Sequence, residues 1–318
     1  MRRIKIFLLS GLCTLFFAVT ANAQDHTQDI NRATEFYNNG AKAVQANDWA
    51  TAIAEFDQAL AILEPLGQEG EEISQTIKEL IPSLHFYLGE EFAKSDRAVD
   101  AIAELKKAIA TAEQFDDLNN TAQKAAILIK QINTRAATNL LNEKKYEEAI
   151  VAYKELLEGD PENGTFHFCI GVSYYATGKE ANAIAALEKA SELGAKNADG
   201  QLVNIYLRKA QAAAAAKKFD DMFASAEKVL AFDANNVNGN KLLGQAAFEL
   251  KRWDAAISAY EKVLPLESNP DNTLYNLARA HENKGNKAKA CENYKKLVTS
   301  SNAQLKAFAE AKVKELCN

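Results

Sequence analysis

Two consecutive 34-residue stretches decide the fold of this chain: VNGNKLLGQAAFELKRWDAAISAYEKVLPLESNP (237–270) and DNTLYNLARAHENKGNKAKACENYKKLVTSSNAQ (271–304). Both place a small residue, an alanine twelve positions later and a tyrosine four positions beyond that in the same register. These residues are Gly244, Ala256 and Tyr260 in the first stretch, and Ala278, Ala290 and Tyr294 in the second. Self-similarity at a fixed period of this length indicates a repeat architecture, which determines the fold class.

The same register occurs seven times along the chain. The small residues are Gly40, Gly89, Ala137, Gly171, Ala210, Gly244 and Ala278. Twelve positions later come Ala52, Ala101, Ala149, Ala183, Met222, Ala256 and Ala290. Four positions beyond these come Phe56, Leu105, Tyr153, Leu187, Ala226, Tyr260 and Tyr294. Two antiparallel helices can pack closely where small side chains meet, and a large residue four positions on fills the space beside them. The pattern therefore predicts seven helix pairs.

The pattern resembles the tetratricopeptide repeat, a helix-turn-helix unit of 34 residues. The copies that match best are 164–197, 237–270 and 271–304, and Gly171, Tyr174, Gly178, Ala183 and Ala190 agree with the family's preferences. The resemblance implies an all-α, right-handed solenoid of about seven repeats. Their ranges are 33–66, 82–115, 130–163, 164–197, 203–236, 237–270 and 271–304. The amphipathic stretch Ala303–Leu316 then predicts a C-terminal capping helix over 305–318, because a solenoid must cover its last stacking face.

The first two intervals between small residues are 49 and 48 positions, whereas the later ones are 34 or 39. The extra residues fall around 67–81 and 116–129. They either lengthen helices or form protruding loops, and Gly67 with Gly70 indicates a break in the first insert.

The N-terminus has the order of a secretory signal peptide: Arg2, Arg3 and Lys5, then the apolar run Ile6–Val19, then Ala21-Asn22-Ala23. The apolar run is too short for a permanent membrane span. We expect cleavage after residue 23, a short polar segment over 24–32, and a periplasmic mature chain without an integral membrane span. Loss of three basic residues changes the formal net charge from −6 to −9. An acidic chain repels phosphate backbones, so no nucleic-acid partner is expected.

Three cysteines remain after cleavage: Cys169, Cys291 and Cys317. If the last repeat's second helix and the capping helix run antiparallel about residues 300–304, Cys291 and Cys317 lie about equally far from the bend. Export to an oxidising compartment then favours a disulfide between them, with two free thiols as the alternative. Cys169 is expected to be a core residue.

The chain lacks the sequence patterns of catalytic and metal sites. It has no Gly-rich phosphate loop, no His-Glu-x-x-His and no nucleophile elbow. Adjacent acidic pairs such as Glu147-Glu148 point in different directions on a helix, and His281 is expected to be a satisfied packing residue. We therefore expect a protein that is no enzyme and needs no cofactor or metal.

The resemblance implies that the first helices of the repeats line a concave groove that receives a segment of a protein or peptide partner. The family's groove positions correspond here to Phe168, Val172, Tyr175, Asn204, Leu207, Gln211, Asn238, Lys241, Gln245, Phe248, Asn272, Tyr275, Arg279 and Asn283. Aromatic rings, amides and a few cations suit peptide binding. Lys241, Asn276 and Arg279 only partly match the carboxylate clamp of the family. The leading interpretation is a protein-interaction scaffold in the cell envelope. The alternative is a structural component that self-associates into homo-oligomers.

Overall fold

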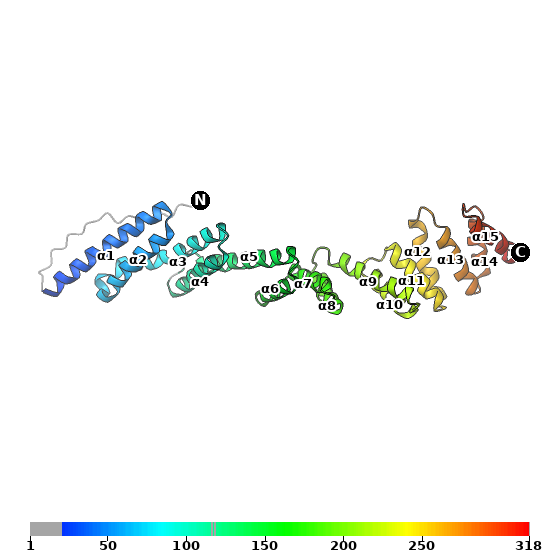
Figure 1. Ribbon diagram of the computed structural model, residues 1–318, viewed down its shortest axis with the longest axis horizontal. Helices are drawn as coiled ribbons and strands as arrows, with labels where there is room; N and C mark the ends of the chain where they lie inside the picture. Colours follow the sequence, from blue (N-terminus) through cyan, green and yellow to red (C-terminus); the bar gives the residue numbers. More distant parts are fainter. Residues whose placement is uncertain (1–20, 116, 118, 318) are drawn as a thin grey trace. The chain divides into compact units, whose positions relative to one another are not determined.

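The computed structural model describes residues 21–115, 117 and 119–317, and every regular element within them is a helix. The all-α prediction is therefore confirmed. The chain divides into two compact units, of which one ends at Asn139 and the other begins at Leu140. The predicted leader, residues 1–23, lies outside the described residues except for its last three positions, which belong to α1 (Ala21–Ala46) (Figure 1).

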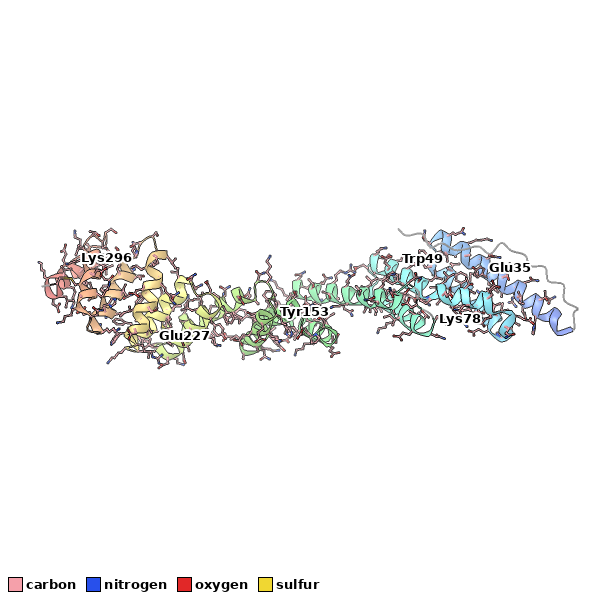
Figure 2. The ribbon with its side chains drawn as sticks, turned by 180° about the vertical axis from the view of Figure 1, so that it is seen from behind. Glu35, Trp49, Lys78, Tyr153, Glu227 and Lys296 are labelled. Atoms are coloured by element: carbon pink, nitrogen blue, oxygen red, sulfur yellow. A yellow bond between two sulfur atoms is a disulfide. The ribbon has the colours of Figure 1, made fainter. Side chains whose placement is uncertain are left out.

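The first unit contains two helix pairs and most of the helix that follows them. Its elements are α1, α2 (Trp49–Leu63), η1 (Glu64–Glu69), α3 (Glu71–Lys94), α4 (Ala98–Gln114) and α5 (Thr121–Asn142). The expected polar segment 24–32 is helical as part of α1. Trp49, labelled in Figure 2, begins α2 and stacks on Tyr87 of α3 with 5.0 Å between ring centres. An aromatic residue after the turn thus joins the first repeat to the second.

Both inserts fall in long helices, α3 with 24 residues and α5 with 22 residues. After α2, the 3₁₀ helix η1 holds Gly67 at φ 56°, and α3 then runs from Glu71 through Pro82 to Lys94. Asp117 accepts hydrogen bonds from the backbone N–H groups of Thr121 and Ala122 at 2.7 and 3.0 Å. These bonds satisfy N–H groups that the first turn of α5 leaves free. Of the two alternatives, the structure has longer helices, each after a short break.

The second unit contains the end of α5, four complete helix pairs that follow α6, and a last single helix. Its elements after α5 are α6 (Tyr146–Gly159), α7 (Gly164–Ala176), α8 (Glu180–Glu192), α9 (Ala198–Ala215), α10 (Phe219–Phe232), α11 (Val237–Glu249), α12 (Trp253–Val263), η2 (Leu264–Leu266), α13 (Asp271–Asn283), α14 (Lys287–Leu297) and α15 (Ala303–Leu316). The pairs α7–α8, α11–α12 and α13–α14 lie within the ranges 164–197, 237–270 and 271–304, whereas α9 begins at Ala198, five residues before the predicted start of 203–236.

Four glycines of the repeat register lie where two helices of a pair approach most closely. A Cβ on Gly171 would lie 2.6 Å from Cγ of Leu187, and one on Gly244 would lie 2.7 Å from the ring of Tyr260. Gly40 faces Phe56 and Gly89 faces Leu105 in the same way. Each large partner is the residue sixteen positions later, as the register predicts. The helices therefore pack so closely that any side chain at these glycines must displace its neighbour.

Seven turns between consecutive helices each have one residue in the left-handed conformation, seven positions after the small residue of the register. These residues are Asn47, Asp96, Lys144, Gly178, Lys217, Lys251 and Gly285, with φ between 57° and 88°. The next residue donates its N–H to a carbonyl five positions earlier, as Lys179 does to Tyr174 at 2.9 Å. This is the Schellman closure of a helix C-terminus, and it fixes where each second helix begins.

The last helix, α15, covers the end of the final pair. Ala309 is fully buried against α13 and α14. Lys312 pairs with Glu282 of α13 at 2.6 Å, and the hydroxyl of Tyr294 donates to the same carboxylate at 2.8 Å. Cys291 and Cys317 lie at disulfide distance, with their Cα atoms 5.5 Å apart. The predicted capping helix is therefore present, and side-chain contacts and a cysteine pair hold it.

Candidate partner-binding groove

The first helices of the last two repeats, α11 and α13, border a hollow of about 480 Å³ in the second unit. Lys241, Gln245 and Phe248 follow one another on α11 at spacings of four and three positions, so they share one helical face. Three α13 residues have the same spacing and face the same hollow: Asn272, Asn276 and Arg279. We call this hollow the α11–α13 groove. Glu249, Tyr260 and Thr273 complete its lining.

Arg279 is the central cation of the α11–α13 groove. Its guanidinium carbon lies 4.7 Å from the ring centre of Phe248 and 5.4 Å from that of Tyr275. Within the described part of the chain, Arg279 forms no ion pair with a carboxylate. Stacking on aromatic rings orients a guanidinium while its edge donors stay available, and a carboxylate can accept two of these hydrogen bonds. This arrangement suits recognition of an anionic group.

Lys241 differs from Arg279 because it already has an internal partner. Its ammonium pairs with the carboxylate of Glu267, which also accepts a hydrogen bond from the hydroxyl of Thr273. The Glu267 side chain is only 13% exposed, so the folded chain holds it in place beside Lys241. Glu267 could not be predicted from the sequence, because it lies in the linker between two repeats and no helical spacing relates a linker residue to the groove.

The floor of the α11–α13 groove belongs to the core of the repeat. Tyr260 is 3% exposed and packs its ring against Gly244. Burial raises the pKa of Tyr260 above its ordinary value, and nearby Arg279 opposes this only in part. Its hydroxyl is therefore neutral at physiological pH. The groove thus has an aromatic floor, amide walls, one cation without an ion pair, and the carboxylate of Glu249 in its lining.

The structure brings together some of the predicted groove residues and separates others. Lys241, Gln245, Phe248, Asn272 and Arg279 line the α11–α13 groove, and so does Asn276 of the partly matched carboxylate clamp. Tyr275 joins them through its contact with Arg279.

The remaining predicted groove residues lie elsewhere. Phe168 and Tyr175 pack partly buried against the core between α7 and α9. Tyr175 also accepts a hydrogen bond from Arg208 at 3.0 Å and lines a separate hollow with it. Gln211 and Asn238 are exposed and line neither hollow.

Two residues outside the groove were singled out from the sequence, and one of them is not as expected. Cys169 is half-buried, and burial raises the pKa of its thiol, so the reactive thiolate is disfavoured. His281 is 5% exposed, but neither ring nitrogen has a hydrogen-bond partner among the described residues. It is therefore a packing residue whose polar atoms are unsatisfied, although four charged groups lie near enough to act on its ring: Glu261, Lys284, Lys289 and Glu292. The expectation of a satisfied histidine was wrong.

Within the described ranges, no group of three or more His, Cys, Asp or Glu side chains is placed to hold a metal ion. Among the same residues, no helix is both long enough and apolar enough to cross a membrane.

Comparisons with known proteins identify the repeats. A family model described as TPR repeat matches residues 140–178, and one described as tetratricopeptide repeat matches residues 242–304. The second match contains every residue of the α11–α13 groove except Lys241. A comparison with curated proteins gave no match.

Solved structures that resemble the chain include YrrB, a TPR protein with an unusual peptide-binding site. It is 18% identical, with 57% of this chain and 91% of that chain covered and a TM-score of 0.34. The MamA protein is 21% identical, with 58% and 94% covered and a TM-score of 0.33. Because these TM-scores lie below 0.5, the assignment rests on the repeat matches and on the helix pairs.

Proposed function

Because this chain is a tetratricopeptide repeat protein, we propose that it is a non-enzymatic adaptor that binds an acidic segment of a partner protein in the α11–α13 groove. Repeats of this kind are protein-interaction modules. The proposal rests on the environment of Arg279. Its guanidinium lies over the rings of Phe248 and Tyr275 and forms no ion pair in the described chain. A carboxylate of the partner bonds the guanidinium edge, while Gln245 and the α13 amides bond the peptide backbone.

The proposal also includes export to the periplasm. Two observations support it: the leader pattern of residues 1–23 and the cysteine pair at disulfide distance. Disulfides persist in oxidising compartments and are rare in the cytosol. Fractionation of the producing cells, with N-terminal sequencing of the protein, tests this part. A mature chain that starts at Gln24 in the periplasmic fraction supports export, and an uncleaved chain in the cytosol contradicts it.

Peptide selection tests the binding function. A phage library of random dodecapeptides is selected on residues 24–318, and the enriched peptides are synthesised for fluorescence-anisotropy titration. We expect a carboxylate in most of them and a 10- to 100-fold weaker Kd for Arg279→Gln, since a hydrogen-bonded charge contributes about 1.5–3 kcal/mol. Arg252→Gln is the matched control, because Arg252 stacks on Phe223 at 4.5 Å outside the groove.

Equal binding by the native protein and Arg279→Gln would refute the groove. If no peptide is enriched and the native protein sediments as concentration-dependent oligomers, the structural, self-associating alternative replaces the adaptor.

A further inference from the structure

We propose that the capping helix α15 belongs to the binding surface, where Phe308 forms an apolar subsite for an aromatic or leucine-like side chain of the same acidic segment. The inference rests on the proposed function and names a second feature of the partner. A cap needs only to cover the last repeat, so a half-exposed ring beside the groove requires an explanation of its own.

The exposure of Phe308 is the first observation. Its side chain is 37% exposed, whereas its neighbour Ala309 is fully buried and forms the packing face of α15. The ring of Phe308 lies edge-on to Tyr275 at 5.3 Å and to Tyr294 at 6.0 Å between ring centres. The Phe308 ring is therefore held on two sides by aromatic neighbours and is open to solvent elsewhere.

Continuity with the groove is the second observation. Arg279 lies 5.4 Å from the ring centre of Tyr275 on α13, and Phe308 lies 5.3 Å from the same centre. Arg279 and Phe308 are thus at most about 11 Å apart, because both contact Tyr275. An extended peptide advances about 3.3 Å per residue. One segment can therefore place an acidic side chain at Arg279 and an apolar side chain, two or three positions away, at Phe308.

The position of Phe308 is fixed independently of any ligand. Lys312, one helical turn further along α15, pairs with Glu282 of α13 at 2.6 Å. The cysteine pair Cys291–Cys317 ties the end of α15 to α14. A preformed ring costs little conformational entropy on binding, which is what an anchoring subsite requires.

Charge decides the kind of occupant. An apolar patch alone would accept any hydrophobic surface, but the neighbouring Arg279, which has no ion pair in the described chain, favours a carboxylate close to the apolar side chain. The occupant is therefore a short acidic peptide segment of a partner protein. A second copy of this chain and a purely hydrophobic partner are the other outcomes of the test.

The random dodecapeptide library is selected in parallel on the native protein, Phe308→Ala, Arg279→Gln and Val151→Ala. Val151 is a matched control, because it is a 57% exposed apolar residue of the same unit outside the groove. We expect native selections to pair an acidic residue with an aromatic or leucine-like one two or three positions away. Phe308→Ala should keep the acidic residue, lose the apolar preference and bind native-selected peptides 5- to 30-fold more weakly.

The four selections distinguish the proposal for the α11–α13 groove from the proposal for the Phe308 subsite. If Arg279→Gln abolishes binding while Phe308→Ala selects and binds the same peptides as the native protein, the subsite is refuted and the groove stands. Self-capture without peptide enrichment, or enrichment of apolar peptides without carboxylates, refutes both.

A second experiment detects contact at position 308 without the Phe308→Ala substitution, which could weaken binding by loosening α15. The native sequence with 4-fluorophenylalanine at position 308 should show a ¹⁹F shift on titration with a native-selected peptide. It should show none with a version of that peptide whose apolar residue is serine. Equal shifts with both peptides contradict the subsite.

Discussion

Replacing Gly171 by alanine should destabilise the protein relative to the same change at Gly200. Both glycines lie within helices, α7 and α9, so both variants share the higher helix propensity of alanine, up to about 1 kcal/mol. The two sites differ in the space around the added methyl group. A Cβ at Gly200 meets nothing within 4 Å, whereas one at Gly171 lies 2.6 Å from Cγ of Leu187 and 3.2 Å from its backbone nitrogen.

The magnitude follows from this difference. The nitrogen belongs to the backbone of α8, and Cγ can move only by rotating a leucine side chain that is 1% exposed, so relief of the contact disturbs the packing of the helix pair. Overpacking of this kind costs about 1–3 kcal/mol. Because the propensity gain is shared, we expect Gly171→Ala to be less stable than Gly200→Ala by about 2 kcal/mol in its free energy of unfolding.

Urea denaturation followed by circular dichroism at 222 nm measures this difference. With a slope of about 2 kcal/mol/M, the two midpoints should differ by about 1 M. Adding Leu187→Ala to Gly171→Ala should recover part of the loss, because the shortened side chain vacates the contested space. Midpoints within 0.2 M of each other, or no coupling between positions 171 and 187, would refute close approach as the reason for glycine in this register.

Three further predictions concern the cap, a buried histidine and a turn. Replacing Cys291 and Cys317 by serine should lower the free energy of unfolding of the C-terminal repeat by up to about 3.5 kcal/mol, because the loop between them spans 26 positions. Urea titrations with and without reductant measure this loss. An unchanged urea midpoint contradicts it. Burial lowers the pKa of His281 below its usual 6.5, so the unfolded chain takes up a proton first as pH falls. Stability should therefore decrease below about pH 6.5 and be retained above it, and His281→Leu should reduce the difference in Tm between pH 7.5 and 5.5. Four charged groups also act on the histidine ring: Glu261, Glu292, Lys284 and Lys289. Lys217→Gly should raise stability by up to about 1 kcal/mol, because Lys217 has φ 57° and glycine adopts this conformation without strain; a thermal melt below that of the native protein would contradict this.

The helix pairs could be predicted from the sequence because their decisive contacts are local. Gly171 and Leu187 lie sixteen positions apart, and the contact between them follows from two helices and one short turn. Such contacts recur at the same spacing in the four copies whose small residue is glycine, so the register identifies them without knowledge of the rest of the chain. The capping helix follows from the same logic, since Ala309 buries the face that the final repeat would otherwise expose.

The sequence could not show whether the inserts form helices or loops, because local helix propensity and burial in the tertiary structure favour opposite outcomes there. Pro82 within α3 lacks a backbone donor and costs about 3 kcal/mol inside a helix, which indicates a helix that begins at residue 82. The structure continues the helix upstream because Ile77 is fully buried and Ile81 is 3% exposed. Burial of two such side chains contributes roughly 3–6 kcal/mol, enough to offset the proline. That comparison requires knowledge of what the side chains contact.

In the groove, too, helical spacing could be read from the sequence, whereas a contact from a linker residue could not. Helical spacing placed Lys241 and Arg279 on equivalent faces, so both were expected to meet a partner. Glu267 makes them unequal, because it pairs with Lys241 from a linker that no periodicity describes. Because Glu267 is 13% exposed and also accepts a hydrogen bond from Thr273, it stays with Lys241, and an incoming carboxylate gains little at this lysine. Arg279 has no ion pair within the described chain, although it interacts electrostatically with Glu282, and two rings already orient it. Discrimination for acidic segments should therefore reside at Arg279, and Lys241 should contribute mainly to the rate of encounter.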